Sequence, residues 1–144
     1  MKLHIITIGE PKLSYAKEGW NEYLKRLQRY HQVRITHLAD KWAYDTSHIM
    51  LAAGSAYKVG LVIAGKSFSS PDLAAFLEKR ALEGREVCFI IGGPEGLPMD
   101  VQQQMDLQWS FSPLTFPHDL AMVVLAETLY RASTIGAGHP YHKA

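Results

Sequence analysis

The sequence contains one cysteine and no apolar run of the roughly 18 residues that a membrane-spanning helix requires. A single cysteine excludes a disulfide within the chain, and Cys88 lies in an apolar run, so we expect a buried thiol in a reducing compartment. Residues 1–9 are too short and too polar for a signal peptide. These absences predict a cytoplasmic protein with no membrane-spanning segment.

Several motifs of familiar catalytic and binding sites are also missing. The seven histidines lack the His-Glu-x-x-His spacing and have no cysteine partners, which argues against a metal site. Residues 92–96, Gly-Gly-Pro-Glu-Gly, fit neither the dinucleotide-binding fingerprint nor the phosphate-binding P-loop. No Gly-x-Ser-x-Gly turn is present, so a serine hydrolase is not indicated.

The overall charge is small. A formal net charge of +1 gives no general indication of a nucleic-acid-binding protein. Residues 1–41, however, hold eight Lys and Arg residues against four acids. This local excess fits ordinary solvated faces and an RNA-facing surface equally well.

Apolar, β-branched runs alternate with helical patterns along the chain. The expected strands cover residues 3–8, 33–38, 59–64, 86–91 and about 107–111. The expected helices cover residues 20–30, 70–84, 100–105 and about 117–135. Apolar strands that alternate with helices predict one α/β domain over residues 1–144, with a mostly parallel sheet and helices on both faces.

One helix start is well marked, and one region is hard to interpret. Ser70-Pro71-Asp72 predicts a helix with Ser70 as its N-cap, and Gly84 ends it. Residues 39–47 show no periodicity and read as a mobile loop, and Gly54 weakens the helical pattern of residues 49–53.

Loops that follow parallel strands are the usual place for a ligand on such a sheet. Three loops qualify here: residues 65–66, 92–96 and 112–117. The glycines of residues 92–96 allow close approach of the backbone to a ligand, but a plain turn also explains them. Residues 110–118 are either a backbone recognition segment or a helix start capped by Thr115.

Two further groups of residues have a structural and a functional interpretation. Glu127 and Arg131 are four residues apart and can pair on one helix face, as many solvated pairs do. Tyr141, His142 and Lys143 either fray with the terminus or stack on a base and hold a phosphate. The sequence alone favours neither interpretation of the tail.

Four ordered motifs now resemble a known family. They are residues 90–97, 109–118, 126–132 and 140–143, with further similarity at 61–66 and 23–27. Their order and spacing resemble the RlmH family of SPOUT-class methyltransferases over nearly the whole chain. The sequence departs from the family pattern in two places. Met122 stands where members usually have arginine, and the region of residues 39–55 is shorter and less charged than in most members.

The resemblance implies a fold and an activity. It implies an α/β fold with a C-terminal trefoil knot and a homodimer whose active site crosses the interface. It implies S-adenosylmethionine (SAM) as cofactor and methylation of ring nitrogen 3 of a pseudouridine in large-subunit ribosomal RNA. The modest net charge favours the assembled ribosome as substrate over naked RNA.

The resemblance also implies site residues. The cofactor-binding positions correspond to Leu61, Gly92, Phe111, Ser112, Pro113, Leu114, Thr115 and Phe116. The catalytic positions correspond to His142, His118, Arg131 and Tyr141, and the substrate-binding positions to Tyr141, His142, Lys143 and Glu127. Tyr141, His142 and Lys143 are expected to come from the partner chain. We expect His142, ahead of His118, to accept the proton of the ring nitrogen.

Other functions remain open at this point. A SPOUT-type enzyme acting on transfer RNA would share the same motifs. A non-catalytic ribosome-binding or assembly module could keep the fold, and a flavin- or nucleotide-binding α/β protein would share the strand-end loops.

Overall fold

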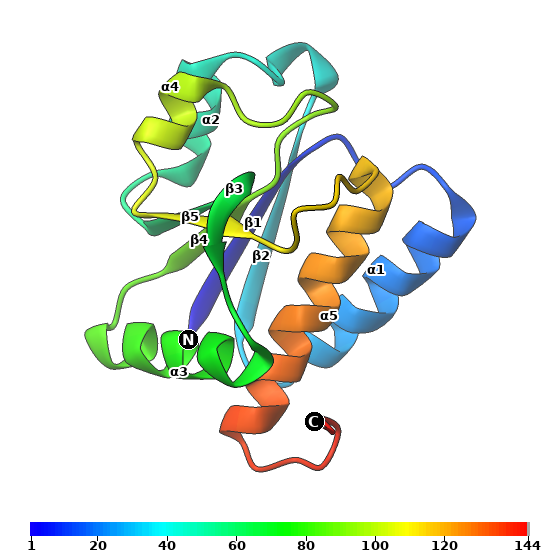
Figure 1. Cartoon of the computed structure of the whole chain (residues 1–144), viewed down its shortest axis with the longest axis vertical. Coiled ribbons are helices and arrows are strands. Elements are labelled where there is room, and N and C mark those ends of the chain that lie inside the picture. The colour runs from blue at the N-terminus through cyan, green and yellow to red at the C-terminus, as the bar shows by residue number, and fades with distance from the viewer. Residues whose placement is uncertain (144) are drawn as a thin grey trace.

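Five parallel strands form the centre of the protein, in the order β2-β1-β4-β3-β5 (Figure 1). The computed structural model describes residues 1–143. The strands are β1 (Lys2–Ile8), β2 (Gln32–Leu38), β3 (Tyr57–Ser67), β4 (Val87–Ile90) and β5 (Leu107–Ser110). The predicted α/β fold with a parallel sheet is confirmed, and all the described strand pairs are parallel.

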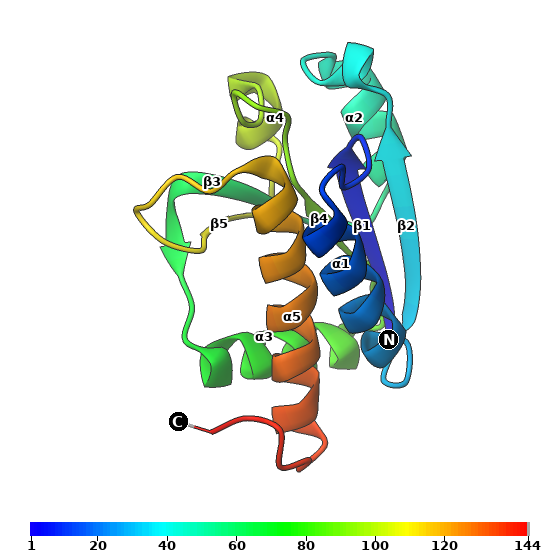
Figure 2. The same cartoon turned by 90° about the vertical axis from the view of Figure 1, so that its right-hand side faces the viewer.

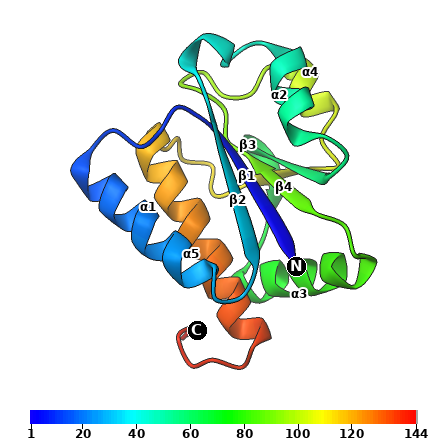
Figure 3. The same cartoon turned by 180° about the vertical axis from the view of Figure 1, so that it is seen from behind.

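Helices cover both faces of this sheet, as expected. They are α1 (Ser14–Leu27), α2 (Thr46–Ala53), α3 (Ser70–Glu83), α4 (Met99–Gln103) and α5 (His118–Gly136), with a short 3-10 helix η1 (Asp40–Trp42). Core residues of α1, α3 and α5 pack on one face, and those of α2 and α4 on the other. Figures 2 and 3 show α5 lying beside α1.

Alternate residues of the central strands enter the two halves of the core. Leu3, Ile5 and Phe89 pack with α1, α3 and α5, whereas Ile6 and Ile90 pack with α2 and α4. Because both faces are covered, these strands are mostly apolar on both sides, with His4 and Thr7 of β1 as buried polar exceptions, which is why the sequence located them.

The helix start near residue 70 is displaced by one residue from the prediction. Ser69, not Ser70, is the N-cap: its hydroxyl accepts from the amide of Asp72 at 3.1 Å, and the Asp72 carboxylate accepts from the Ser69 amide at 3.4 Å. This reciprocal capping box satisfies two amides that the helix itself leaves free. Gly84 ends α3 in the left-handed conformation at φ 70°, as predicted.

Residues 39–47, which the sequence predicted to be a mobile loop, contain regular secondary structure. This stretch forms η1 and the start of α2, where Asp45 accepts from the His48 amide at 3.0 Å. The Trp42 ring stacks on the His48 ring at 3.5 Å. Local polar and stacking contacts order the segment, and such contacts leave no apolar periodicity in the sequence.

Cys88 is fully buried in β4, as predicted. Burial raises the pKa of its thiol to about 12, so the thiol stays protonated.

Within residues 1–143, no helix is both long and apolar enough to cross a membrane. The same residues contain no group of three or more His, Cys, Asp or Glu side chains placed to hold a metal ion.

Candidate functional site

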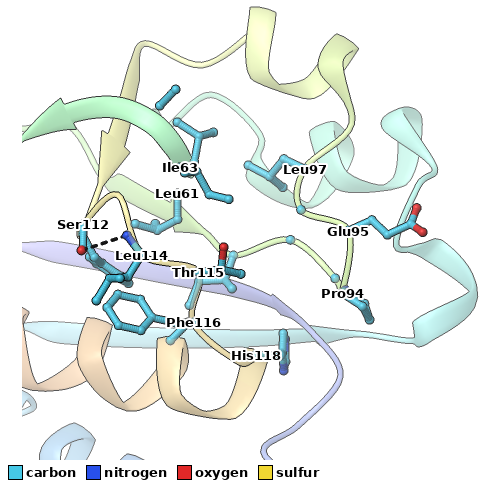
Figure 4. Close-up of a pocket in the computed structure, with 18 of the residues that line it drawn as sticks. Leu61, Ile63, Pro94, Glu95, Leu97, Ser112, Leu114, Thr115, Phe116 and His118 are labelled. Atoms are coloured by element: carbon cyan, nitrogen blue, oxygen red, sulfur yellow. Dashed lines mark hydrogen bonds between the residues drawn. The ribbon is translucent and has the colours of Figure 1, made fainter.

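A cavity of about 450 Å³ opens where β3, β4 and β5 end (Figure 4). Its walls are residues 61–64 of β3, residues 91–97 after β4 and much of the segment 111–118 after β5. This is the position that the parallel sheet predicts, and the volume suits a ligand of a few tens of atoms.

The wall from β3 is an irregularity of the strand. Leu61 pairs with Trp109, and Lys66 pairs with Trp109 again, so residues 62–65 bulge away from β5. Val62, Ile63 and Ala64 of this bulge line the cavity. The apolar run of residues 59–64 predicted only a plain strand here, so these three lining residues were not predicted. Gly65 was the available signal, because a Cβ there would lie 2.8 Å from the carbonyl oxygen of Gln108.

The wall from β4 is the glycine-rich turn. The amide of Gly96 donates to the carbonyl of Gly93 at 2.9 Å, which folds the turn back on itself. A Cβ at Gly92 would lie 2.5 Å from the backbone of Gly96 and Leu97. Only glycine fits at position 92, so this turn shapes the cavity through its backbone.

The wall from β5 is held by serine hydroxyls. Ser110 donates to the carbonyl of Ser112 at 3.0 Å, and the Ser112 hydroxyl accepts from the Leu114 amide at 3.1 Å. The amides of Thr115 and Phe116 make no hydrogen bond to another described residue. The loop therefore presents free backbone donors beside apolar side chains.

Most of the predicted cofactor-binding residues lie together at this cavity. The lining includes Leu61, Gly92, Phe111, Ser112, Leu114, Thr115 and Phe116. Pro113 is exposed and does not line it. Leu97, Gln102 and Ala121 also line the cavity and were not predicted as site residues. Gln102 and Ala121 lie on α4 and α5, and the motifs alone did not show how these helices approach the cavity.

His118 begins α5 and points its side chain toward the cavity (Figure 4). Its Nε2 is buried and has no hydrogen-bond partner among the described residues. Burial lowers the pKa of His118, although Asp119, with an oxygen 3.8 Å from Nδ1, acts in the opposite direction. The imidazole is therefore neutral at neutral pH.

The residue before His118, Pro117, is the N-cap of α5, so Thr115 does not cap this helix.

Asp119 ties the start of α5 to the chain ahead of α1. Its Oδ2 accepts from the amides of Lys12 and Leu13 at 2.9 and 2.7 Å. Burial opposes ionisation, but these two hydrogen bonds lower the pKa of Asp119 overall. The contact joins residues more than a hundred positions apart, so no local pattern indicated it.

The remaining predicted side chains form a second group, which we call the tail group: Glu127, Arg131, Tyr141 and His142. Glu127 Oε1 accepts from Arg131 Nη2 at 2.6 Å and from the Tyr141 hydroxyl at 3.1 Å. Arg131 Nη1 donates to His142 Nδ1 at 3.2 Å, because arginine has no acceptor. Tyr141 and His142 therefore pack against α5.

The environment of the tail group changes two of its pKa values. Hydrogen bonding to Glu127 raises the pKa of Arg131, and burial raises the pKa of Tyr141. Both groups keep their protons at neutral pH and act as hydrogen-bond donors.

The tail group does not reach the cavity of its own chain. Glu127 follows His118 by nine residues on α5, which corresponds to about 14 Å along the helix. Figure 2 shows the segment before α5 and the tail toward opposite ends of the helix. Lys143 is exposed. Of the predicted catalytic residues, His118 alone lines the cavity.

Two sequence observations concern charge. Met122 is fully buried in the core, so the position where the family usually has arginine packs here as an apolar residue. The cations of residues 1–41 do not line the cavity, and three of them form ion pairs. These pairs are Lys12–Asp40, Arg26–Glu22 and Arg34–Glu86.

Comparisons with known proteins agree with this architecture. A family model described as "Predicted SPOUT methyltransferase" matches residues 1–142. The chain is 51% identical to a protein of Deinococcus deserti, over 99% of this chain and all of the relative. It is 50% identical to one of Deinococcus radiodurans, over 99% of each chain. Both relatives are named "Ribosomal RNA large subunit methyltransferase H".

More distant proteins extend the similarity. A protein of Azotobacter vinelandii with the same name is 38% identical over 99% of this chain and all of that relative. A solved structure, "a probable methylase family protein from Haemophilus influenzae Rd KW20", shares the fold with a TM-score of 0.58 at 9% identity. That alignment covers 99% of this chain and 70% of the other. By its full-length match and its relatives, the chain belongs to the SPOUT methyltransferase family.

Proposed function

We propose that this protein transfers a methyl group from SAM to ring nitrogen 3 of a pseudouridine in large-subunit ribosomal RNA. The observation that carries the proposal is the strand-end cavity, where residues 92–97 and 111–116 meet as the family motifs imply. The full-length relatives named as ribosomal RNA methyltransferases support the substrate class.

The residues of the cavity fit SAM. Leu61, Leu97 and Phe116 offer apolar contacts for the faces of an adenine ring. The free amides of Thr115 and Phe116 are donors for its polar edge. When bound, SAM supplies an electrophilic methyl group on a positively charged sulfur. The protein contributes position and exclusion of water, which are the main requirements for such a transfer.

The ring nitrogen carries a proton that must leave, and we assign its acceptance to His118. The imidazole lines the cavity, is neutral because burial lowers its pKa, and has an unpartnered Nε2. This choice reverses the preference for His142 that the sequence suggested. His142 Nδ1 accepts from Arg131 in the described chain, and the ring lies away from the cavity.

A homodimer would bring the tail group of one protomer to the cavity of the other. The support is geometric, because one chain separates these two sets of residues along α5. In this arrangement Arg131 and Tyr141 orient the base, and Lys143 holds a phosphate of the ribosomal RNA. We also propose the trefoil knot, because the chain leaves the edge strand β5 and returns to α5, which packs against α1 and α3.

Methyl transfer from labelled SAM tests the activity. The substrates are separated subunits, intact ribosomes and transfer RNA, and the modified nucleoside is identified by mass. We expect a singly methylated pseudouridine from the large subunit, with intact ribosomes as the best substrate. Methylation of transfer RNA instead, or SAM binding absent altogether, would contradict the proposal.

Two histidine variants test the assigned roles. His118→Asn should lower kcat by about 100-fold or more and make the rate rise with pH, because solvent hydroxide must then accept the proton. His142→Ala should instead raise KM for the ribosome more than it lowers kcat. Unchanged turnover in His118→Asn, together with turnover lost in His142→Ala at normal SAM affinity, would return the role of base to His142.

A further inference from the structure

A second groove lies at the β5 edge of the sheet, between the end of β3 and α3. We call it the β5-edge groove; its volume is about 510 Å³. Three aromatic rings and three cations line it: Tyr57, Phe68, Phe76, Lys66, Lys79 and Arg80. We propose that the β5-edge groove binds an unpaired segment of the substrate RNA. The inference rests on the proposed function, because it takes RNA as the substrate.

The charge of the groove is complementary to phosphate. Lys66 and Lys79 are exposed, and neither forms an ion pair with a described residue, whereas Arg80 pairs with Glu83 at 3.2 Å. Asp72 is the one acid in the lining, and its carboxylate is engaged in capping α3 through the Ser69 amide. The chain as a whole carries a net charge of only +1, so this positive surface is a local feature.

The rings make the groove suitable for bases as well as phosphates. The centroid of Phe76 lies 5.5 Å from that of Phe68 and 5.7 Å from that of Tyr57, so the rings are contiguous. The Arg80 guanidinium carbon lies 4.7 Å from the Tyr57 centroid, and Lys66 Nζ lies 5.2 Å from the Phe68 centroid.

Ring faces beside cations are the usual platform for splayed-out bases and their phosphates. A duplex keeps its bases stacked within the helix, so it could use the cations but not the rings. The chemistry therefore favours unpaired RNA.

The groove and the cofactor cavity share two strands. On β3, Ala64 lines the cavity and Lys66 lines the groove. Leu107 at the start of β5 lines the groove, and Phe111, just after β5, lines the cavity. Four residues of extended chain correspond to about 13 Å, so one RNA segment can contact both sites. The groove would hold nucleotides that flank the methylated base.

The first experiment removes the two exposed cations. The double variant Lys66→Ala/Lys79→Ala should raise KM for the ribosomal substrate about 10-fold, with kcat and SAM affinity unchanged. Its affinity for a short single-stranded RNA should depend less on salt, with a log–log slope shallower by about 1.4 for two lost phosphate contacts. The control Lys2→Ala/Lys17→Ala removes the same charge from exposed positions that line neither site and should stay within about 2-fold of wild type.

A milder variant tests the stacking component. Phe68→Leu keeps an apolar side chain in the same place but removes the ring face. It should weaken binding of the single-stranded RNA about 5-fold or more without changing the salt slope. A duplex of the same sequence should bind wild type more weakly than the single strand and should not respond to Phe68→Leu.

The outcomes separate this inference from the proposed function. If wild type methylates ribosomal RNA while the double variant matches its control in KM and salt slope, the groove proposal is overturned and the activity stands. If wild type methylates no ribosomal RNA but single-strand binding still depends on Lys66, Lys79 and Phe68, the groove stands and the substrate assignment fails. Tighter binding of the duplex, or equal loss in the control, would overturn the groove as a site for unpaired RNA.

Discussion

At its amino end α5 faces a cavity made of loop backbone, whereas farther along it carries a group of side chains that bind one another. The cavity owes its shape partly to Gly92, and the amides of Thr115 and Phe116 beside it make no hydrogen bond to another described residue. The tail group consists of charged and aromatic side chains joined by hydrogen bonds, with Glu127 at its centre. One chain forms the walls of the cavity by itself, whereas its tail group lies away from that cavity.

The two loop walls hold their shape because each runs between a strand and a helix, from β4 to α4 and from β5 to α5. One chain can therefore form the strand-end cavity alone. The side chains of the tail group satisfy one another in the described chain, and none of them lines that cavity. In the proposed function these side chains act when a second protomer supplies them, so cofactor binding and turnover should respond differently to mutation.

A titratable side chain also anchors each part of α5. Asp119 holds the amino end to the amides of Lys12 and Leu13. Near the carboxyl end, His31 Nε2 lies 2.8 Å from the Ser133 hydroxyl, which itself donates to the Leu129 carbonyl at 2.7 Å. Burial lowers the pKa of His31 to about 4, with the nearby N-terminal ammonium as a second cause.

The largest expected effect is on SAM affinity, from a substitution in the glycine-rich turn that lines the cavity. Gly92→Ala places a Cβ where the Gly96 and Leu97 backbone lies 2.5 Å away, so the turn must move. We expect SAM affinity to fall about 100-fold, since a misplaced wall loses several contacts at once. Calorimetric titration with SAM measures the change.

Gly136→Ala at the other end of α5 is the matched control. A Cβ there would lie 3.7 Å from Glu78 Oε1, an ordinary contact, and alanine favours the helix. Its SAM affinity should equal that of wild type. Equal loss in both variants would mean that the cavity does not depend on the turn at Gly92.

An intermediate effect is expected for the anchor at the cavity. Asp119→Ala leaves the amides of Lys12 and Leu13 without their buried acceptor and should lower the free energy of unfolding by about 2 kcal/mol. Urea unfolding at pH 7 measures it. The exposed control Glu18→Ala should change stability by less than about 0.5 kcal/mol. A change no larger than the control would show that this contact adds nothing to stability.

The smallest expected effect is on how the free energy of unfolding changes with pH, through His31 and Asp119. His31 is neutral in the folded chain down to about pH 4, whereas the unfolded residue binds a proton near its ordinary value of 6.5, so acid favours unfolding between these values. His31→Gln should remove about 1–2 kcal/mol of this loss, measured as the difference from wild type in urea unfolding at pH 7 and pH 4.5.

The same experiment carried to lower pH compares the two ends directly. The lowered pKa of Asp119 means that its contribution is lost only as pH falls through that value, below the ordinary range for aspartate. Acid should therefore loosen the carboxyl end of α5 first and the cavity end second. If His31→Gln and wild type lost the same free energy of unfolding between pH 7 and 4.5, His31 would not be the group that makes the carboxyl end of α5 sensitive to acid.

Much of the fold could be predicted because its signals are local. β4 is apolar throughout and β1 is so except at His4 and Thr7, since helices cover both of their faces. The end of α3 at Gly84 followed from a left-handed backbone that favours glycine. The N-cap was misplaced by one residue because adjacent serines, Ser69 and Ser70, both suit that role.

The site was less predictable where it depends on irregular backbone or distant contacts. The bulge at residues 62–65 leaves the apolar run of β3 intact, so only Gly65 could have indicated it. Residues 39–47 are ordered by the Asp45 cap and the Trp42–His48 stack, which have no repeat to detect. Asp119 anchors a segment that is far away in sequence.

The sequence by itself determined the order of the strands and of α1, α3, α4 and α5, the parallel sheet, and two of the loops that line the strand-end cavity. These depend on periodicity and on backbone conformations that glycine or serine enforces over a few residues. Only the tertiary structure decided which side chains share a site: it placed His118 at the cavity and Arg131, Tyr141 and His142 away from it. The physical reason is that a helix separates residues by 1.5 Å per position, so neighbours in a motif face different surroundings once α5 has packed.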